Sequence, residues 1–132
     1  MATKVLVVDD EASVRHLLQV MLATEGYEPL LAANGAEGLQ LAHEHMPALV
    51  ILDWMMPVLD GLATLQALRN DPATADLPVV MLTARQGDNA MAQAMVHGAD
   101  FYITKPFDAE EMLAVVRRFV RNGDKARGEG KQ

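Results

Sequence analysis

The 132-residue sequence contains no cysteine, and its apolar runs are short. Without cysteine there are no disulfide staples, no thiol catalysis and no thiolate metal sites. The first apolar run, residues 5–8, ends at Asp9 after four residues. A signal peptide needs an apolar stretch of about 7–15 residues and a membrane span needs about 20, so this run predicts neither. We therefore expect a cytoplasmic protein with no membrane partner.

Internal repeats and low-complexity segments are also absent. Apolar residues make up 51% of the chain and charged residues 22%, which is ordinary composition for one globular domain. The net charge of −7 is unevenly distributed, because residues 117–132 carry +4 and the preceding 116 residues carry −11. An acidic body repels phosphate backbones, so we expect no direct contact of this domain with nucleic acid.

Short apolar runs alternate with amphipathic stretches along the chain. The runs are rich in Val, Ile and Leu and predict strands over residues 5–8, 30–33, 48–52, 77–82 and 101–103. The stretches repeat apolar residues at helical spacing and predict helices over residues 11–25, 36–44, 62–70, 89–97 and 109–122. Because parallel strands need right-handed crossovers, this (βα)5 pattern predicts an α/β fold in which helices cover both faces of a parallel sheet.

The apolar pattern stops after Asn122. We therefore predict a folded domain over residues 1–122. Residues 123–132 are polar and contain Gly and Lys, which is typical of a flexible terminus or of a linker to a further domain.

Polar side chains stand at the predicted strand ends. Asp9 and Asp10 follow the first strand, Asp53 the third and Thr83 the fourth, and Lys105 closes the fifth. Open α/β sheets bind ligands at the carboxyl ends of their strands. In the flavodoxin-like, doubly wound order 2-1-3-4-5, which periodicity does not determine, these five residues would converge on one pocket.

Each of these residues alone has a simpler interpretation. Asp or Thr after a strand is typical of a helix cap, and a Lys beside Asp is usually a structural ion pair. Together, three carboxylates repel one another unless positive charge compensates them. Lys105 supplies one charge, and Mg²⁺, or Mn²⁺ in its place, would supply two more. With the metal bound, Asp53 is placed to attack phosphorus, and the Thr83 hydroxyl to donate to a phosphoryl oxygen.

Four motifs in this order resemble the response regulator receiver domain of two-component signalling, including the chemotaxis regulators. They are Asp9-Asp10, Asp53 within LVILDWMMPVLDG, Thr83-Ala84 and Lys105-Pro106-Phe107. The resemblance covers residues 4 to about 121, and the four motifs together are highly specific.

The resemblance implies a role for each matching residue. Asp53 matches the phosphoacceptor. Asp9, Asp10, Asp53 and the Met55 backbone carbonyl match the ligands of Mg²⁺. Lys105 matches the phosphate-binding lysine.

Further matches concern the surroundings of the phosphoacceptor. The resemblance implies a cis bond from Lys105 to Pro106. Ala84 matches the small residue that leaves access for phosphate. The loop after Asp53 includes Trp54, which we expect to pack in the core or at its rim. It continues to the matching residues Pro57, Asp60 and Gly61. Met55 and Arg85 match positions that tune the lifetime of the phosphoryl group.

A conformational switch is also implied. Thr83 would move toward the phosphoryl group, and Tyr102 would turn inward into the vacated space, although a half-buried aromatic residue is the simpler interpretation. Partners would then read the surface formed by residues 89–97, 101–103 and 109–122. One position departs from the family: receivers joined to winged-helix DNA-binding domains commonly have an acidic residue where this chain has Phe101, which argues against that subgroup.

The function expected from these features is signalling, with no enzymatic activity beyond the domain's own phosphorylation and dephosphorylation. The expected partners are a histidine kinase or histidine phosphotransfer protein and a downstream protein or output domain. The chain is then either a stand-alone regulator or the receiver of a larger multidomain regulator or hybrid kinase.

Two other classes are disfavoured by the residues after the first strand. A phosphatase of the haloacid dehalogenase type has an Asp nucleophile there and a second acid two residues later. Here Asp9 and Asp10 are adjacent, position 11 is Glu11, and the chain has no room for a cap domain. A flavodoxin-like cofactor site needs a loop rich in Gly, Ser or Thr, and Asp9-Asp10-Glu11 has the wrong charge.

Overall fold

The computed structural model of the chain describes residues 2–56, 59–84 and 88–129, with residue 88 and residues 121–129 described by their backbone alone. Five strands and five helices alternate within these ranges. The strands are β1 (Lys4–Val8), β2 (Glu28–Ala32), β3 (Leu49–Asp53), β4 (Val79–Thr83) and β5 (Phe101–Thr104). The helices are α1 (Ala12–Thr24), α2 (Gly35–His45), α3 (Gly61–Asn70), α4 (Asp88–Val96) and α5 (Ala109–Glu129).

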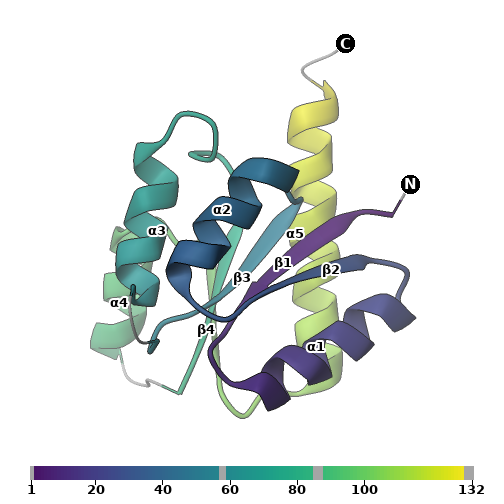
Figure 1. The fold of residues 1–132 in the computed structure, drawn as a ribbon, viewed down its shortest axis with the longest axis horizontal. Helices are drawn as coiled ribbons and strands as arrows, with labels where there is room; N and C mark the ends of the chain where they lie inside the picture. The colour runs from purple at the N-terminus through teal and green to yellow at the C-terminus, as the bar shows by residue number, and fades with distance from the viewer. Residues whose placement is uncertain (1, 57–58, 85–87, 130–132) are drawn as a thin grey trace.

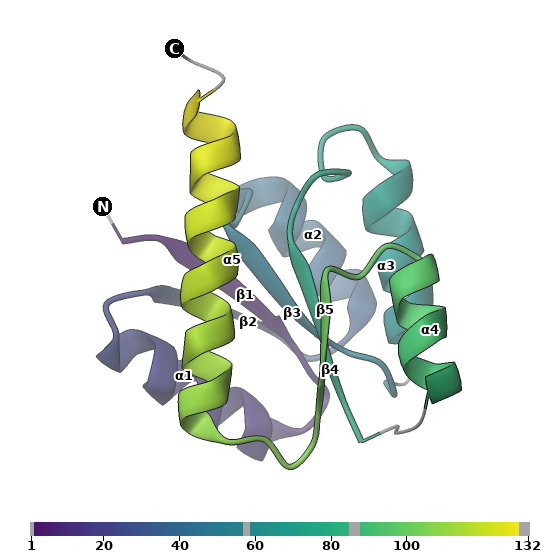
Figure 2. The ribbon, with the colours of Figure 1, turned by 180° about the vertical axis from the view of Figure 1, so that it is seen from behind.

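The strands form one parallel sheet in the order β2-β1-β3-β4-β5, which confirms the predicted flavodoxin-like architecture. Helices α2, α3 and α4 lie on one face of the sheet, and α1 and α5 lie on the other (Figures 1 and 2). Every residue of β3 and β4 is buried, because helices cover both faces of these central strands. This double covering explains their continuous apolar sequences.

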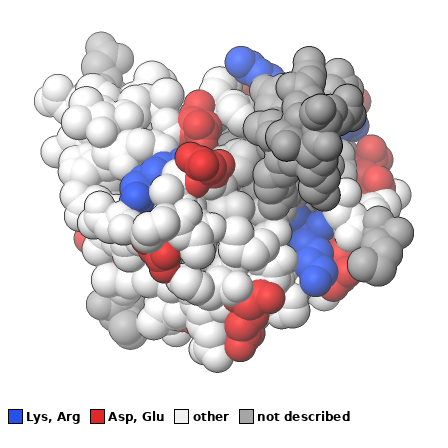
Figure 3. Space-filling model, turned by 90° about the horizontal axis from the view of Figure 1, so that it is seen from above, with Lys and Arg blue, Asp and Glu red and all other residues white. Residues whose placement is uncertain are grey.

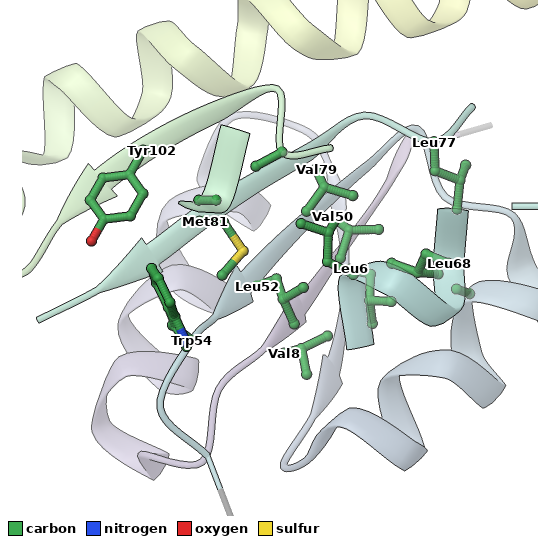
Figure 4. Packing of buried hydrophobic residues seen from close by; sticks show 14 of the residues in the cluster. Leu6, Val8, Val50, Leu52, Trp54, Leu68, Leu77, Val79, Met81 and Tyr102 are labelled. Carbon is green, nitrogen blue, oxygen red and sulfur yellow. The ribbon is translucent and has the colours of Figure 1, made fainter. Parts of the chain in front are cut away.

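Two apolar cores lie on opposite faces of the sheet, because successive strand residues point to opposite sides. On the side of α2, α3 and α4, the core includes Leu6, Val50 and Met81 (Figure 4). On the side of α1 and α5, it includes Val7 and Ile51 together with apolar residues of those two helices. The site described below is therefore built on strands that are held from both sides.

Most element boundaries lie one or two residues from the prediction. Strand β2 begins at Glu28 and includes Pro29, which an edge strand tolerates because one of its sides needs no backbone donor. Strand β4 begins at Val79 and ends at Thr83, later than the apolar run indicates. Asn34 and Asp60 cap α2 and α3 by accepting hydrogen bonds from backbone N–H groups in the first turn.

Helix α5 continues to Glu129, so the predicted helix end at Asn122 was wrong. The apolar periodicity stops there, but Asp124–Arg127 includes Lys, Ala and Arg, which have high helix propensity. The last turns project past the other elements at the end of the molecule that also holds the N-terminus (Figure 1). The domain boundary at residue 122 stays a prediction.

Arg69 joins several segments at the amino-terminal edge of the sheet. Its Nε and Nη2 atoms donate to the Gly98 carbonyl at 3.0 and 2.7 Å, and its Nη1 atom donates to the carbonyls of Ala75 and Leu77. Its Nη2 also lies 3.1 Å from Asp100 Oδ2. We call this group of contacts the Arg69 clamp. It ties the end of α3 to the turn after α4 and to the segment before β4.

The surface carries charges of both signs. Seen from above, acidic and basic residues lie interspersed among uncharged ones (Figure 3). Within the described ranges, no helix is both long enough and apolar enough to cross a membrane.

Candidate functional site

The polar residues singled out in the sequence meet at the carboxyl edge of the sheet, which faces the lower side of Figure 1. Asp9 and Asp10 directly follow β1, Asp53 ends β3, Thr83 ends β4 and Lys105 directly follows β5. These four strands are neighbours in the sheet. Carboxylate oxygens of Asp9, Asp10 and Asp53 all lie within 4.8 Å of one another. The three carboxylates that the sequence predicted at one edge of the sheet therefore lie close together.

Asp9 is held firmly from several directions. Its side chain is 1% exposed, and its Oδ1 accepts a hydrogen bond of 2.9 Å from the Glu11 N–H. Its backbone carbonyl accepts from Arg15 Nη1 at 2.7 Å, and its N–H donates to the Ala32 carbonyl. Asp9 therefore does bond to the start of α1, as the simpler interpretation expected, but only through one of its two oxygens.

The remaining oxygen of Asp9 faces the pocket. Asp9 Oδ2 is buried, and no donor of the described part of the chain is aligned to form a hydrogen bond with it. Lys105 Nζ nevertheless lies 2.9 Å away, so the contact is an ion pair without good hydrogen-bond geometry. This oxygen has capacity left for a further cation.

Asp53 is 3% exposed and sits at the end of a fully buried strand. The Met55 N–H donates to its Oδ1 at 3.4 Å. The start of α3 packs against the backbone that follows Asp53, because the Gly61 N–H donates to the Trp54 carbonyl at 2.7 Å. A Cβ atom at Gly61 would lie 2.4 Å from the Asp53 carbonyl oxygen. Only glycine allows this close approach.

Lys105 places its ammonium group among three carboxylates. Nζ lies 2.7 Å from Glu11 Oε1, 2.9 Å from Asp9 Oδ2 and 3.5 Å from Asp53 Oδ2. The Lys105 backbone N–H donates to the Thr83 carbonyl at 2.9 Å, which fixes the end of β5 against β4. The bond from Lys105 to Pro106 is cis, as the resemblance implied.

The charges shift the pKa values of both central groups. Burial, and after it the charge of Asp9, raises the pKa of Asp53 from 3.8 to about 7, against the opposing effect of Lys105. Burial alone would lower the pKa of Lys105, but its contacts with the Glu11 and Asp9 carboxylates outweigh burial and raise that pKa above its ordinary value. The pocket thus holds more negative charge than Lys105 can neutralise.

The residues present fit a hard divalent cation. Asp9, Asp10 and Asp53 offer oxygen ligands, which Mg²⁺ and Mn²⁺ prefer. Asp9 Oδ2 has no aligned donor, and three carboxylates around Asp53 face only the one positive charge of Lys105, so a further positive charge would be favourable there. The receiver domains that the sequence resembles generally bind Mg²⁺ at such an acidic pocket. That the Met55 carbonyl completes the ligand set stays a prediction.

Two aromatic residues lie beside the site. Trp54 is 3% exposed and packs in the core, as expected, and its ring meets that of Tyr102 edge to face (Figure 4). Tyr102 is 9% exposed and belongs to the same core. The ring is therefore already buried in this structure, although the switch prediction has it turning inward on phosphorylation.

The other predicted residues occupy the rim and the walls. Thr83 is completely buried, whereas Ala84, directly after it, is exposed. Ala84 and Pro106 border an open groove of about 430 Å³. Among the described residues, its lining is Glu11, Val14, Leu17, Ala84, Lys105, Pro106 and Phe107. The Met55 side chain is 59% exposed. Pro57 and Arg85 lie outside the described residues.

Three residues of structural importance escaped the sequence interpretation. Glu11 contacts Lys105, Arg15 bonds the Asp9 carbonyl, and Arg69 forms its clamp. The spacing of Glu11 and Arg15, one helical turn apart, could have suggested that both border the pocket after β1. Nothing local marks Arg69, because its partners lie up to 31 residues away.

Comparison with known proteins defines the class. Residues 5–117 match the family model of the response regulator receiver domain. The chain belongs to this family, and it is a receiver domain of two-component response regulators.

Curated relatives share this domain. The chain is 43% identical over 122 residues to the DNA-binding dual master transcriptional regulator RpaA of Synechocystis, covering 92% of this chain and 51% of that protein. It is 38% identical to the phosphate regulon regulator PhoB of Pseudomonas aeruginosa, covering 89% and 51%. The chain thus spans about half the length of the curated relatives it matches. One of these relatives is named as DNA-binding, although Phe101 departs from the acidic residue expected for receivers of winged-helix regulators.

Solved structures show the same fold. The chemotaxis protein CheY4 of Vibrio cholerae has a TM-score of 0.85 at 32% identity, covering 90% of this chain and 99% of that one. NtrX of Brucella abortus has a TM-score of 0.87 at 32% identity, covering 98% of this chain but only 30% of that one. The fold thus occurs in chains of this length and within much longer ones.

Proposed function

We propose that this receiver domain is the phosphoacceptor of a His-to-Asp phosphorelay and that Asp53 takes the phosphoryl group in a Mg²⁺-dependent reaction. One observation carries the proposal. The buried Asp53 carboxylate shares the carboxyl edge of the sheet with two further carboxylates and with the Lys105 ammonium group, 3.5 Å away.

The reaction follows from this arrangement. A carboxylate oxygen of Asp53 attacks the phosphorus of a phosphohistidine, or of acetyl phosphate, and forms an oxygen–phosphorus bond. The bond to the leaving imidazole nitrogen, or to the acetate oxygen, breaks and its electron pair stays with the leaving group. Lys105 neutralises charge on the transferred group, and Thr83 donates its hydroxyl hydrogen to a phosphoryl oxygen.

Asp9, Asp10 and Asp53 would hold Mg²⁺, or Mn²⁺, with the Met55 carbonyl as a further ligand. When bound, the metal supplies positive charge that stabilises the phosphoryl oxygens. Hydrolysis of the aspartyl phosphate by water releases phosphate and restores the Asp53 carboxylate. The domain therefore catalyses only its own phosphorylation and dephosphorylation, with Ala84 leaving access for the donor.

The output is conformational. Thr83 and Tyr102 couple the phosphoryl group to the surface of α4, β5 and α5, which a downstream protein or an output domain reads. The domain of residues 1–122 belongs either to a stand-alone regulator or to a larger regulator or hybrid kinase. The second alternative is supported by the curated relatives, because the chain spans about half of their length. We propose that the domain receives its phosphoryl group from a histidine kinase or a histidine phosphotransfer protein in the cytoplasm.

Intact-mass spectrometry after incubation with acetyl phosphate tests the proposal. The parent should gain one phosphoryl group with Mg²⁺ and none after chelation. Asp53→Asn should gain none under either condition, whereas Asp76→Asn, which removes an exposed carboxylate remote from the pocket, should behave like the parent. An adduct that persists in Asp53→Asn, or that forms without a divalent metal, would contradict the assignment.

A further inference from the structure

We propose that Glu11 is a positioning residue that holds Lys105 in the unphosphorylated protein and thereby sets how readily a phosphoryl group enters the pocket. The inference rests on the proposed function, because it concerns the same transfer to Asp53. Its basis is that the closest carboxylate to the Lys105 ammonium group belongs to Glu11 and not to Asp53.

The carboxylates around Lys105 compete with an incoming anion for its ammonium group. An ammonium group has three N–H bonds, and three carboxylates surround Nζ in the structure. Glu11 Oε1 is the nearest at 2.7 Å and accepts a hydrogen bond, while Asp53 Oδ2 is the farthest at 3.5 Å. A phosphoryl oxygen that binds Lys105 must therefore compete with these oxygens, and above all with the Glu11 carboxylate, which accepts the hydrogen bond of the ammonium group.

Glu11 is the partner that is easiest to replace. The side chains of Asp9 and Asp53 are 1% and 4% exposed, whereas that of Glu11 is 56% exposed. Separating a buried carboxylate from its cation leaves an unpaired buried charge, but a released Glu11 carboxylate is solvated. The Glu11–Lys105 pair also borders the groove of about 430 Å³, which gives the released side chain room to turn.

The Glu11 side chain makes no contribution to the start of α1. Glu11 is the N-cap residue of that helix, but its side chain forms no capping hydrogen bond. The bonds that shape this turn use its backbone: its N–H donates to Asp9 Oδ1, and its carbonyl accepts from the Arg15 N–H. Replacing the side chain therefore changes the contact with Lys105 and leaves the local backbone intact.

Glu11→Gln removes the negative charge at nearly constant size. We expect its initial rate of phosphorylation by limiting acetyl phosphate, with saturating Mg²⁺, to exceed that of the parent about two- to fivefold, the range set by breaking one exposed ion pair. Beryllofluoride, a phosphoryl mimic followed through Trp54 fluorescence, should bind more tightly by a similar factor. Hydrolysis of the aspartyl phosphate should change less, because the phosphoryl group has by then displaced Glu11.

Salt separates this mechanism from a purely structural effect. Since exposed ion pairs weaken with ionic strength, the ratio of the two rates should fall toward one between ~20 mM and ~500 mM NaCl. A structural defect in Glu11→Gln would not vanish in this way.

Glu25→Gln is the matched control. Glu25 lies just past the other end of α1 and forms a comparable exposed ion pair, with Arg117 at 3.3 Å. This substitution changes the net charge equally but should leave the phosphorylation rate at the parent value. If both variants accelerated phosphorylation equally, net charge alone would explain the effect, and the proposal would be overturned.

The remaining outcomes are distinct from one another. A parent that is phosphorylated at the same rate as Glu11→Gln, or faster, would overturn the role of Glu11 and leave the proposed function standing. A parent that gains no phosphoryl group at all would overturn both.

Discussion

The aromatic rings of Trp54 and Tyr102 pack edge to face. Trp54 directly follows the candidate phosphoacceptor, and Tyr102 lies on β5. Their ring centroids are 6.4 Å apart and their planes make an angle of 87°. This is a favourable geometry for two aromatic quadrupoles. Trp54 is the only tryptophan of the chain, so all of its tryptophan fluorescence comes from a residue of this contact.

Truncating Tyr102 should therefore change the emission of Trp54. We expect Tyr102→Ala to shift the emission maximum to longer wavelength, because water reaches the indole, and to lower the free energy of unfolding by about 3 kcal/mol. Tyr102→Phe keeps the ring and should preserve the emission. Phe101→Ala is the control, since Phe101 packs on Phe119 on the other side of the sheet. An unchanged spectrum in Tyr102→Ala would show that the two rings do not meet in solution.

The raised pKa of Asp53 predicts a pH dependence of stability in the absence of metal. A group whose pKa is higher in the folded state than in the unfolded state stabilises the fold below its unfolded pKa, here 3.8, and this stabilisation is lost as pH rises through about 7. The free energy of unfolding should thus fall between these two pH values. Asp53→Asn should lack this fall and be more stable than the parent at pH 7.5 by on the order of 2 kcal/mol.

Chemical denaturation at several pH values, in the presence of a chelator, measures this difference. Among the described residues, the other groups with shifted pKa values titrate outside the range from pH 3.8 to about 7. The pKa of Asp71 is lowered, chiefly by the Ala73 N–H, so its effect lies below pH 3.8, and that of Lys105 is raised above 10.5. Parallel curves for the parent and Asp53→Asn would show that the Asp53 carboxylate is not destabilised in the fold.

The Arg69 clamp should matter for stability and not for chemistry. Arg69→Leu leaves the carbonyls of Gly98, Ala75 and Leu77 without their donor and Asp100 without its cation, which should cost about 3 kcal/mol of unfolding free energy. Thermal or urea unfolding gives this value. At a temperature where the variant is folded, its rate of phosphorylation should stay within about twofold of the parent, because the clamp lies at the opposite edge from Asp53.

Arg117→Leu serves as the reference for the clamp. It removes an arginine whose partner, Glu25, is exposed, and such surface pairs contribute about 1 kcal/mol or less. If Arg69→Leu costs no more than Arg117→Leu, the hydrogen bonds of the clamp make no net contribution to stability.

Much of the fold and of the site could be predicted because it depends on local patterns. Strands and helices alternate at recognisable periods, and the polar residues that end the strands must then share one edge. Strand order was taken from the known orders of doubly wound sheets, since periodicity carries no information on which strands are neighbours. The contact between Glu11 and Lys105 escaped prediction because it joins residues 94 positions apart. The end of α5 was misplaced because helix propensity, and not apolar spacing, carries the helix past Asn122.

The Arg69 clamp and the carboxylate pocket stand at opposite edges of one sheet, and this separation has an evolutionary consequence. Substitutions around Glu11, Met55 and Ala84 alter the rim of the pocket without touching the bonds that tie α3, α4 and β4 together. Reaction rates can therefore drift in a lineage while the fold stays intact. Such a scaffold can serve signals of very different duration with little structural innovation.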